Sequence, residues 1–295
     1  MTDQPSVFVT APARSGTTYL SHLLAGSLDL SCSPETNVFG ILHRVTRRDP
    51  EMTFGAFEKQ QLGLLMHGGN RSYCALVDRE LRDERIADHP RVFAEWIIGL
   101  DCYTSGASKL EQTPRNGEHL RTARWLFPDA IIVFLLRNPF DVMQSNRATP
   151  WGTRNPAALF AIWARQYCEL VRLSRTYGTR RVVIVRYERL EAEGYRNALL
   201  ARLRKSGIAK RPESISVVPK NFASNDWAGR HMTQSVGDFS KRSAGKWTTQ
   251  YPFLQSLGDG FMVDILRAAR GRRSKSWRLR LLEMADHFAR WRIAR

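Results

Sequence analysis

Residues 14–18 of this chain, Arg-Ser-Gly-Thr-Thr, place a cation, three hydroxyls and a glycine in five consecutive positions. The apolar run at residues 7–9 before them is typical of a buried strand, and leucines recur at helical spacing after them. The N–H groups at the start of such a helix are unpaired and lie at the positive end of its dipole. The stretch therefore predicts a phosphate-binding loop made by Arg14, Ser15, Gly16, Thr17 and Thr18.

A second candidate phosphate contact lies further along the chain. Arg137 follows the unbroken apolar run of residues 130–136, and Ser145 comes eight positions later. Arginine offers a fork of donors to a phosphate, and a serine hydroxyl on the following helix adds another. Because ligands bind at the carboxyl ends of parallel strands, we expect the loops that carry Arg14 and Arg137 to converge on one ligand.

Glu35 is the candidate general base. It stands 21 positions after Arg14, in the sequence Ser-Pro-Glu-Thr-Asn. A carboxylate that faces an acceptor hydroxyl can take its proton during attack. The alternative interpretation is an ordinary solvated carboxylate in a loop.

The expected elements alternate between strands and helices, which predicts a doubly wound parallel sheet. The fold class is therefore α/β: a P-loop-like, three-layer α/β/α single domain with a central parallel sheet. Residues 28–39 are interpreted as a loop across the top of the sheet, and residues 50–106 as helices that cover one face. Expected strands are residues 7–9, 109–114, 130–136 and 182–185, and expected helices are residues 120–127, a helix that begins at Pro139, and 157–177.

Composition limits the class of protein. The chain has 295 residues, 43% of them hydrophobic, which is typical of a globular protein with a sizeable core. No run of about 18 apolar residues predicts a membrane span, and the first residues lack signal-peptide features. The four cysteines are widely spaced, which favours reduced thiols and a cytoplasmic location. The net charge of +17 suits an anionic ligand but does not identify one.

Two segments near the carboxyl end carry further expectations, within one domain over residues 1–295. Residues 221–249 are rich in Ser, Gly, Asn and basic side chains and are expected to form a loop that covers the nucleotide. Residues 272–295 are expected to form a basic amphipathic helix. Such a helix could contact an anionic membrane or dock on the core with its arginines in water.

Taken together, these motifs resemble the sulfotransferases that use 3′-phosphoadenosine 5′-phosphosulfate (PAPS). In that family a basic residue followed by Ser-Gly-Thr-Thr cradles the 5′-phosphate, and an Arg with a Ser eight positions later binds the 3′-phosphate. The position of Glu35 is similar to that of the base in tyrosylprotein sulfotransferases, and related Golgi carbohydrate sulfotransferases also use a Glu near this position. In motif spacing the chain most resembles the tyrosylprotein sulfotransferase-like and bacterial branch. The resemblance also implies that Tyr187 lies near the phosphates and that Lys246, in Gly-Lys-Trp, closes over the nucleotide.

The chain departs from the family pattern at several positions. Ala13 separates Pro12 from the basic residue, and Gln112 occupies a position where many relatives have a Lys. Arg189 replaces the Asp of the usual Tyr-Glu-Asp-Leu. His119 lacks the sequence context of the base in the aryl and steroid branch, so it is not assigned that role.

The resemblance implies transfer of the sulfuryl group from PAPS to an acceptor hydroxyl, with Glu35 and Arg14 as catalytic residues and no metal. A carbohydrate, glycolipid or small metabolite is favoured as acceptor, and a protein tyrosine is the alternative. A P-loop small-molecule kinase is a rival, although the Walker A lysine is missing. A basic membrane-surface or nucleic-acid binding protein is another, although no nucleic-acid partner is expected. Peripheral membrane contact through residues 272–295 remains open.

Overall fold

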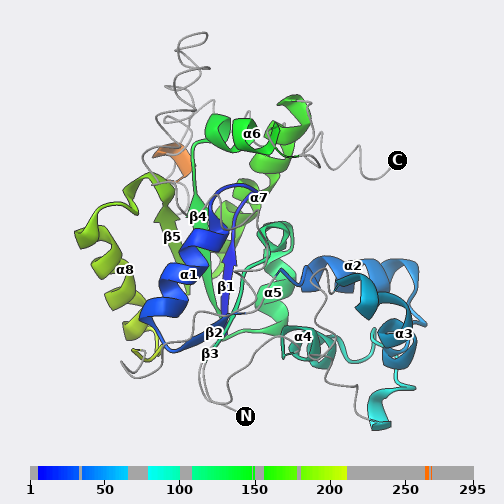
Figure 1. Ribbon diagram of the computed structural model, residues 1–295. Coiled ribbons are helices and arrows are strands. Elements are labelled where there is room, and N and C mark those ends of the chain that lie inside the picture. The colour runs from blue at the N-terminus through cyan, green and yellow to red at the C-terminus, as the bar shows by residue number, and fades with distance from the viewer. Residues whose placement is uncertain are drawn as a thin grey trace.

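The computed structural model describes residues 6–32, 35–65, 79–99, 108–147, 149, 156–177, 181–210, 263–265 and 267. Within these residues, five parallel strands form one sheet with helices on both faces (Figure 1). The strand order β2-β3-β1-β4-β5 puts the first strand of the chain in the centre. The strands are β1 Val7–Thr10, β2 Leu30–Cys32, β3 Ser108–Glu111, β4 Ile131–Leu136 and β5 Val182–Arg186.

Helices α1 and α8 cover one face of the sheet, and α5 and α7 cover the other. Helix α6 lies beyond the carboxyl end of β4, and a group of helices, α2 to α4, lies to one side (Figure 1). The helices are α1 Thr17–Ser27, α2 Val38–Arg48, α3 Phe54–Leu65, α4 Pro90–Gly99, α5 Leu120–Leu126, α6 Pro139–Arg147, α7 Pro156–Tyr177 and α8 Glu193–Lys205. Short 3₁₀ turns are η2 Arg79–Leu81, η3 Pro114–Glu118 and η4 Tyr187–Arg189.

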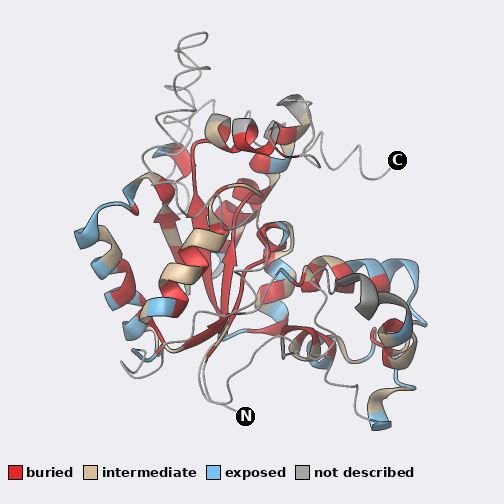
Figure 2. Cartoon of the chain, in the orientation of Figure 1, coloured by how far each residue is buried: buried red, intermediate tan, exposed pale blue. Residues whose placement is uncertain are grey.

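The central strands are buried on both faces, as Figure 2 shows by their colour. In β4, Val133 belongs to the core under α1 and α8, whereas Phe134 packs against Tyr167 of α7 with ring centroids 5.2 Å apart. In β1, Phe8 instead meets Phe39 of α2. A strand with covered faces on both sides needs apolar residues at every position, which is why these strands have no alternating pattern.

The structure confirms the predicted α/β class with its parallel sheet, and it corrects two local interpretations. The segment at residues 28–39 is not only a loop, because it contains β2 and the start of α2. Three residues are too few to show a strand period, and β2 is defined by its pairing with β3. The strand expected at residues 109–114 is β3, which ends earlier, at Glu111. It ends there because the backbone N–H of Thr113 turns back to the Glu111 carboxylate.

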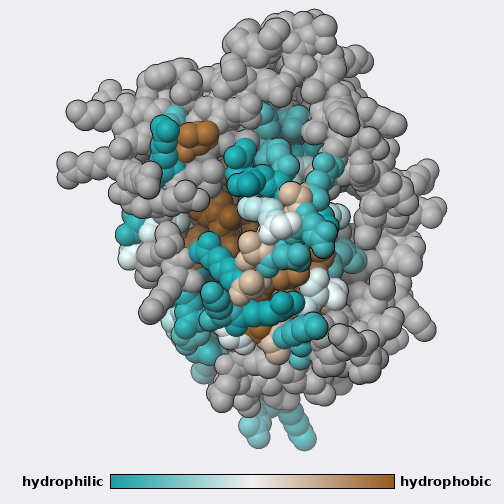
Figure 3. Space-filling model, turned by 90° about the vertical axis from the view of Figure 1, so that its left-hand side faces the viewer, coloured by the Kyte–Doolittle hydropathy of each residue, from teal (hydrophilic) through white to brown (hydrophobic). Residues whose placement is uncertain are grey.

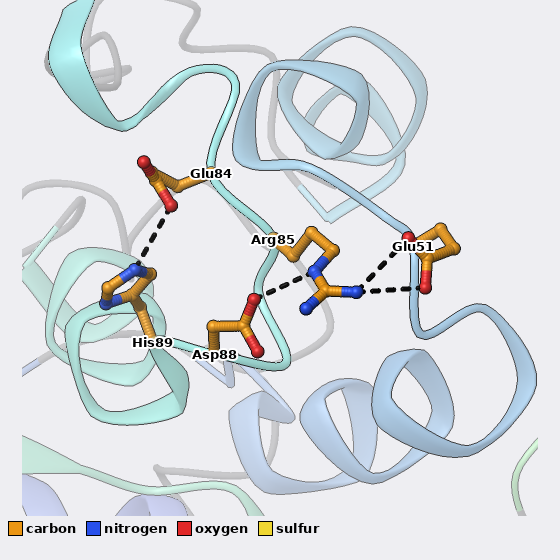
Figure 4. Close-up of polar contacts among 5 residues, drawn as sticks. All are labelled: Glu51, Glu84, Arg85, Asp88 and His89. Atoms are coloured by element: carbon orange, nitrogen blue, oxygen red, sulfur yellow. Dashed lines mark hydrogen bonds and ion pairs between the residues drawn. The ribbon is translucent and has the colours of Figure 1, made fainter.

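Helices α3 and α4 enclose an aromatic cluster, in agreement with the helices expected within residues 50–106. The rings of Phe57 and Phe93 meet edge to face with centroids 4.9 Å apart, and Trp96 packs beside them. At the surface nearby, the Arg85 guanidinium lies 3.1 Å from Glu51 and 2.8 Å from Asp88 (Figure 4). Exposed ion pairs of this kind contribute little to stability.

The described surface over α8 is mainly hydrophilic, with apolar side chains visible between the polar ones (Figure 3). Leu199, Leu200 and Leu203 of α8 are buried against the sheet. None of the helices in the described part of the chain is long and apolar enough to cross a bilayer. Of the four cysteines, Cys32 and Cys168 fall within that part, and both are buried.

Candidate active site

The loop between β1 and α1 has the backbone of an anion-binding turn. Arg14 and Gly16 have left-handed backbones, with φ of 71° and 98°, and the N–H of Ser15 donates to Pro12 O at 3.1 Å. Gly16 immediately precedes α1, and the Thr17 and Thr18 N–H groups begin the helix. Ser15 is fully buried, and its hydroxyl has no hydrogen-bond partner among the residues that the structure describes. The loop therefore offers donors at the positive end of a helix of 11 residues.

The two predicted phosphate motifs meet in space. Nη1 of Arg137 donates to the carbonyl oxygen of Arg14 at 3.1 Å, and Nε of Arg14 donates to Oγ of Ser145 at 3.3 Å. Both Arg137 and Ser145 are buried. The carboxyl ends of β1 and β4 adjoin in the sheet, so the convergence expected from the sequence is confirmed as geometry. The structure does not test the roles of these residues in binding.

Tyr187 packs against both motifs. The guanidinium carbon of Arg137 lies 4.0 Å from the centroid of the Tyr187 ring, a cation–π contact. The same ring covers Gly16, where an added Cβ would lie 2.9 Å from Cδ2 and closer still to Cε2. Tyr187 also belongs to the core under α1. Tyr187 therefore contacts Arg137, the loop and the core, and its predicted role near the phosphates stays a prediction. Arg189, at the position of the family's Asp, instead lies over Tyr195 of α8.

Gly16 gives a sharp test of this packing. We expect Gly16→Ala to lower the free energy of unfolding by roughly 2–4 kcal/mol, because the methyl group meets Tyr187 and the left-handed backbone disfavours a side chain. Thermal unfolding measures the change. Gly26→Ala on the same helix is the matched control, since no atom lies within 4 Å of its Cβ position. Equal melting temperatures for the two variants would contradict the assigned packing.

Glu35 lies in the segment that leads into α2, and the residue as a whole is exposed, although the surrounding protein partly desolvates its carboxyl group. Desolvation by the surrounding protein, followed by the nearby Glu111, raises the pKa of Glu35 to about 7 against the opposing effect of Arg14. Burial and the neighbouring Arg137 in turn lower the pKa of Arg14, and Glu35 raises it. Because water still reaches Glu35, solvent screening limits these effects. A carboxyl with a pKa near neutrality that remains accessible is suited to accepting a proton.

Sequence reasoning missed Glu111, the last residue of β3. Its carboxylate is fully buried and accepts hydrogen bonds from Thr36, Thr113 and Asn116. The available signal was an acidic residue at the end of a predicted buried strand, in Leu-Glu-Gln-Thr-Pro. The next residue, Gln112, is buried as well.

The remaining candidates from the sequence are His119, which was not assigned as the base, and segments near the carboxyl end. Burial, together with the smaller effect of His43, lowers the pKa of His119 to about 4, so its imidazole is neutral at pH 7. The rings of His119 and His43 lie with centroids 5.2 Å apart. Lys246, the expected nucleotide-covering loop at residues 221–249 and the basic helix expected at residues 272–295 lie outside the described residues.

A parallel sheet with an anion-binding type of loop after its central strand defines a P-loop-like α/β fold. The chain belongs to the sulfotransferase family, whose sequence profile matches residues 5–197. Membership of this family agrees with the sulfotransferase predicted from the sequence and not with the kinase alternative.

Two known proteins illustrate the relationship. The nodulation protein NoeE of Sinorhizobium fredii is 28% identical over 207 residues, which cover 62% of this chain and 45% of that protein. The chain thus spans slightly less than half of this curated relative. The sulfotransferase domain of the Synechococcus PCC 7002 olefin synthase superposes with a TM-score of 0.53 at 18% identity, over 98% of this chain and 95% of that one. The second likeness supports the fold alone.

Proposed function

We propose that this protein transfers the sulfuryl group of PAPS to an acceptor hydroxyl. The observation that carries the proposal is the convergence of two phosphate-type motifs. Arg14, from the loop after β1, contacts Ser145 on α6 and accepts a hydrogen bond from Arg137 at the end of β4. PAPS carries phosphate groups on both the 3′ and the 5′ positions of its ribose. Two adjacent cationic motifs therefore match PAPS better than a nucleotide that is phosphorylated only at the 5′ position.

The residues present fit such a donor. The buried Ser15 hydroxyl lacks a partner among the described residues, and the left-handed Gly16 immediately precedes the N–H groups at the start of α1. Ser15, Gly16, Thr17 and Thr18 would hold the 5′-phosphate, and Arg137 with Ser145 would hold the 3′-phosphate. Tyr187 would orient Arg137. The role of Lys246 remains a proposal from the sequence resemblance.

Bound PAPS would supply the sulfuryl group, which exchanges its bond to the 5′-phosphate oxygen for a bond to the acceptor oxygen, leaving 3′,5′-ADP. Glu35 takes the proton of the acceptor hydroxyl during the attack. Arg14 and the N–H groups at the start of α1 stabilise the charge that develops on the departing phosphate. Positioning and charge stabilisation are the main contributions in the related transfer of phosphoryl groups. We propose that no metal takes part.

The acceptor is proposed to be a hydroxyl of a carbohydrate, a glycolipid or a small metabolite. The solvent exposure of Glu35 supports an acceptor that arrives from outside the protein. A protein tyrosine is the second candidate, supported by the sequence position of Glu35. A cytoplasmic location, the absence of a nucleic-acid partner and membrane contact through residues 272–295 remain proposals as well.

Thermal unfolding with nucleotides tests the donor site without knowledge of the acceptor. We expect 3′,5′-ADP, at about 100-fold its Kd and without metal, to raise the melting temperature by roughly 5–10 °C. The physical reason is that this ligand binds the folded protein through both phosphate motifs. We expect a much smaller rise with 5′-ADP. Stabilisation by ATP with Mg²⁺ but not by 3′,5′-ADP would contradict the proposal.

Incubation with PAPS labelled in the sulfuryl group then identifies the acceptor. A panel of polysaccharides, glycolipids, small phenols and alcohols, and tyrosine peptides separates the two acceptor classes. Label recovered on a carbohydrate or small molecule supports the favoured class, and label recovered only on tyrosine peptides supports the alternative.

A further inference from the structure

Glu111 is a buried carboxylate for which the proposed chemistry gives no role. It ends β3 and is 0% exposed, and its hydrogen-bond partners in the described structure are all neutral. An ionised carboxylate is costly to bury without partners. The hydrogen-bond donors around Glu111 therefore indicate what the carboxyl group does at this position.

Donors from three segments converge on this carboxylate. The backbone N–H of Thr36 donates at 3.4 Å and its hydroxyl at 2.9 Å. The backbone N–H of Thr113 donates to both oxygens at 3.1 Å, and its hydroxyl and the Asn116 side-chain amide also donate. Burial raises the pKa of Glu111, and the hydrogen bonds from Thr113 and Thr36 oppose that rise. A backbone N–H can only donate, so these contacts favour the ionised form.

The same contacts fix the segment that carries Glu35. Thr36 is the next residue, and its hydroxyl also accepts the N–H of Val38 at 3.2 Å. The N–H of Asn37 donates to the Thr113 hydroxyl at 2.8 Å, and Asn37 has a left-handed backbone with φ of 51°. Residues at the end of β3 therefore fix the backbone of Thr36 and Asn37 just before α2. Glu35 directly precedes this fixed segment.

We propose that Glu111 is a positioning residue that holds the Thr36 segment, and with it Glu35, while bringing a second carboxyl group close to the base. This inference rests on the proposed role of Glu35. Among the described residues, the charged groups that act on Glu35 are Glu111 from β3 and Arg14 from the loop after β1. Of the two, Glu111 favours the protonated form of Glu35, and Arg14 favours the ionised form.

Carboxyl titration by carbon-13 NMR tests the inference without donor or acceptor. Glutamate is labelled at its carboxyl carbon, and the Glu35 resonance is identified by its absence from Glu35→Gln. We expect Glu111→Gln to move the Glu35 midpoint down by roughly one pH unit, because a like charge has been removed. An unmoved midpoint would overturn the proposal.

Glu118→Gln is the matched control. Glu118 follows the same strand, but it pairs with Arg165 at 3.1 Å and with Arg115 at 3.7 Å and does not contact the Thr36 segment in the described hydrogen bonds. We expect its substitution to leave the Glu35 midpoint in place. An equal shift in both variants would overturn the proposal, because a general loss of negative charge would then explain the result.

A second variant covers the case in which Glu111→Gln does not fold. Thr36→Val removes one hydroxyl donor but keeps the buried charge. We expect turnover to fall about 10-fold while the Kd for 3′,5′-ADP stays unchanged, and wild-type turnover would overturn the positioning role. Failure of the proposed function would appear separately, as no stabilisation by 3′,5′-ADP, since the titration uses no nucleotide.

Discussion

Glu35→Gln is expected to lower kcat by roughly 10²- to 10⁴-fold while leaving the Kd for 3′,5′-ADP unchanged. Glutamine keeps the size of the side chain but cannot accept the acceptor proton, and Glu35 is not one of the proposed phosphate contacts. Turnover of labelled PAPS with the acceptor found by the panel, together with nucleotide titration, measures both quantities.

The raised pKa of Glu35 also predicts the direction in which kcat and stability change with pH. With a pKa raised to about 7, Glu35 is mostly protonated and inactive as a base below pH 7, so kcat should rise with pH through that value. Stability should move in the opposite direction. Folding raises this pKa above the ordinary 4.5, so ionising Glu35 weakens the folded state as pH rises from 4.5 through about 7. Glu35→Gln should therefore melt no lower than the wild type at pH 8.

Glu51→Gln is the control for this substitution. Glu51 is exposed and pairs with Arg85, beyond the far end of α2, a helix about 16 Å long. It should keep wild-type kcat and the same pH profile. Near-normal turnover of Glu35→Gln would show that another group takes the proton.

Arg14→Ala is expected to reduce kcat by roughly 10²- to 10³-fold, the effect of removing one strong donor from a developing oxyanion. Arg14 joins the two phosphate motifs, because its Nε donates to Ser145 and its carbonyl oxygen accepts from Arg137. Alanine keeps a Cβ at the same left-handed position, so backbone strain is little changed. The Kd for 3′,5′-ADP should also rise, and single-turnover rates separate this loss of binding from the chemical step.

Arg85→Ala supplies the matched control for a lost guanidinium. Arg85 is bound by Glu51 and Asp88 at the exposed surface and has no contact with the phosphate motifs among its described ion pairs (Figure 4). It should retain wild-type turnover. If Arg14→Ala and Arg85→Ala have the same kcat, the proposal that Arg14 stabilises the charge on the departing phosphate is wrong.

Much of the fold could be predicted from the sequence because its central strands are long, apolar runs. The run before Arg137 identified β4 within one residue, and the Pro139 signal placed the start of α6. The three-residue strand β2 could not be found in this way. Its strand conformation is set by hydrogen bonds to β3, a segment more than 70 residues later in the chain, and not by a local pattern.

The sequence by itself determined which residues could bind phosphate. Cations, hydroxyls and a glycine at the start of a helix have that chemistry whatever the arrangement of the rest of the chain. Only the tertiary structure decided how they combine. The Arg14–Ser145 contact joins residues 131 positions apart, and the Thr36–Glu111 contact joins residues 75 apart. From the sequence, Tyr187 was equally compatible with core packing and with a place near the phosphates. In the structure its ring packs over Gly16 and Arg137 and belongs to the core under α1. Such contacts depend on which strands are neighbours in the sheet, and that order is a property of the packed chain as a whole.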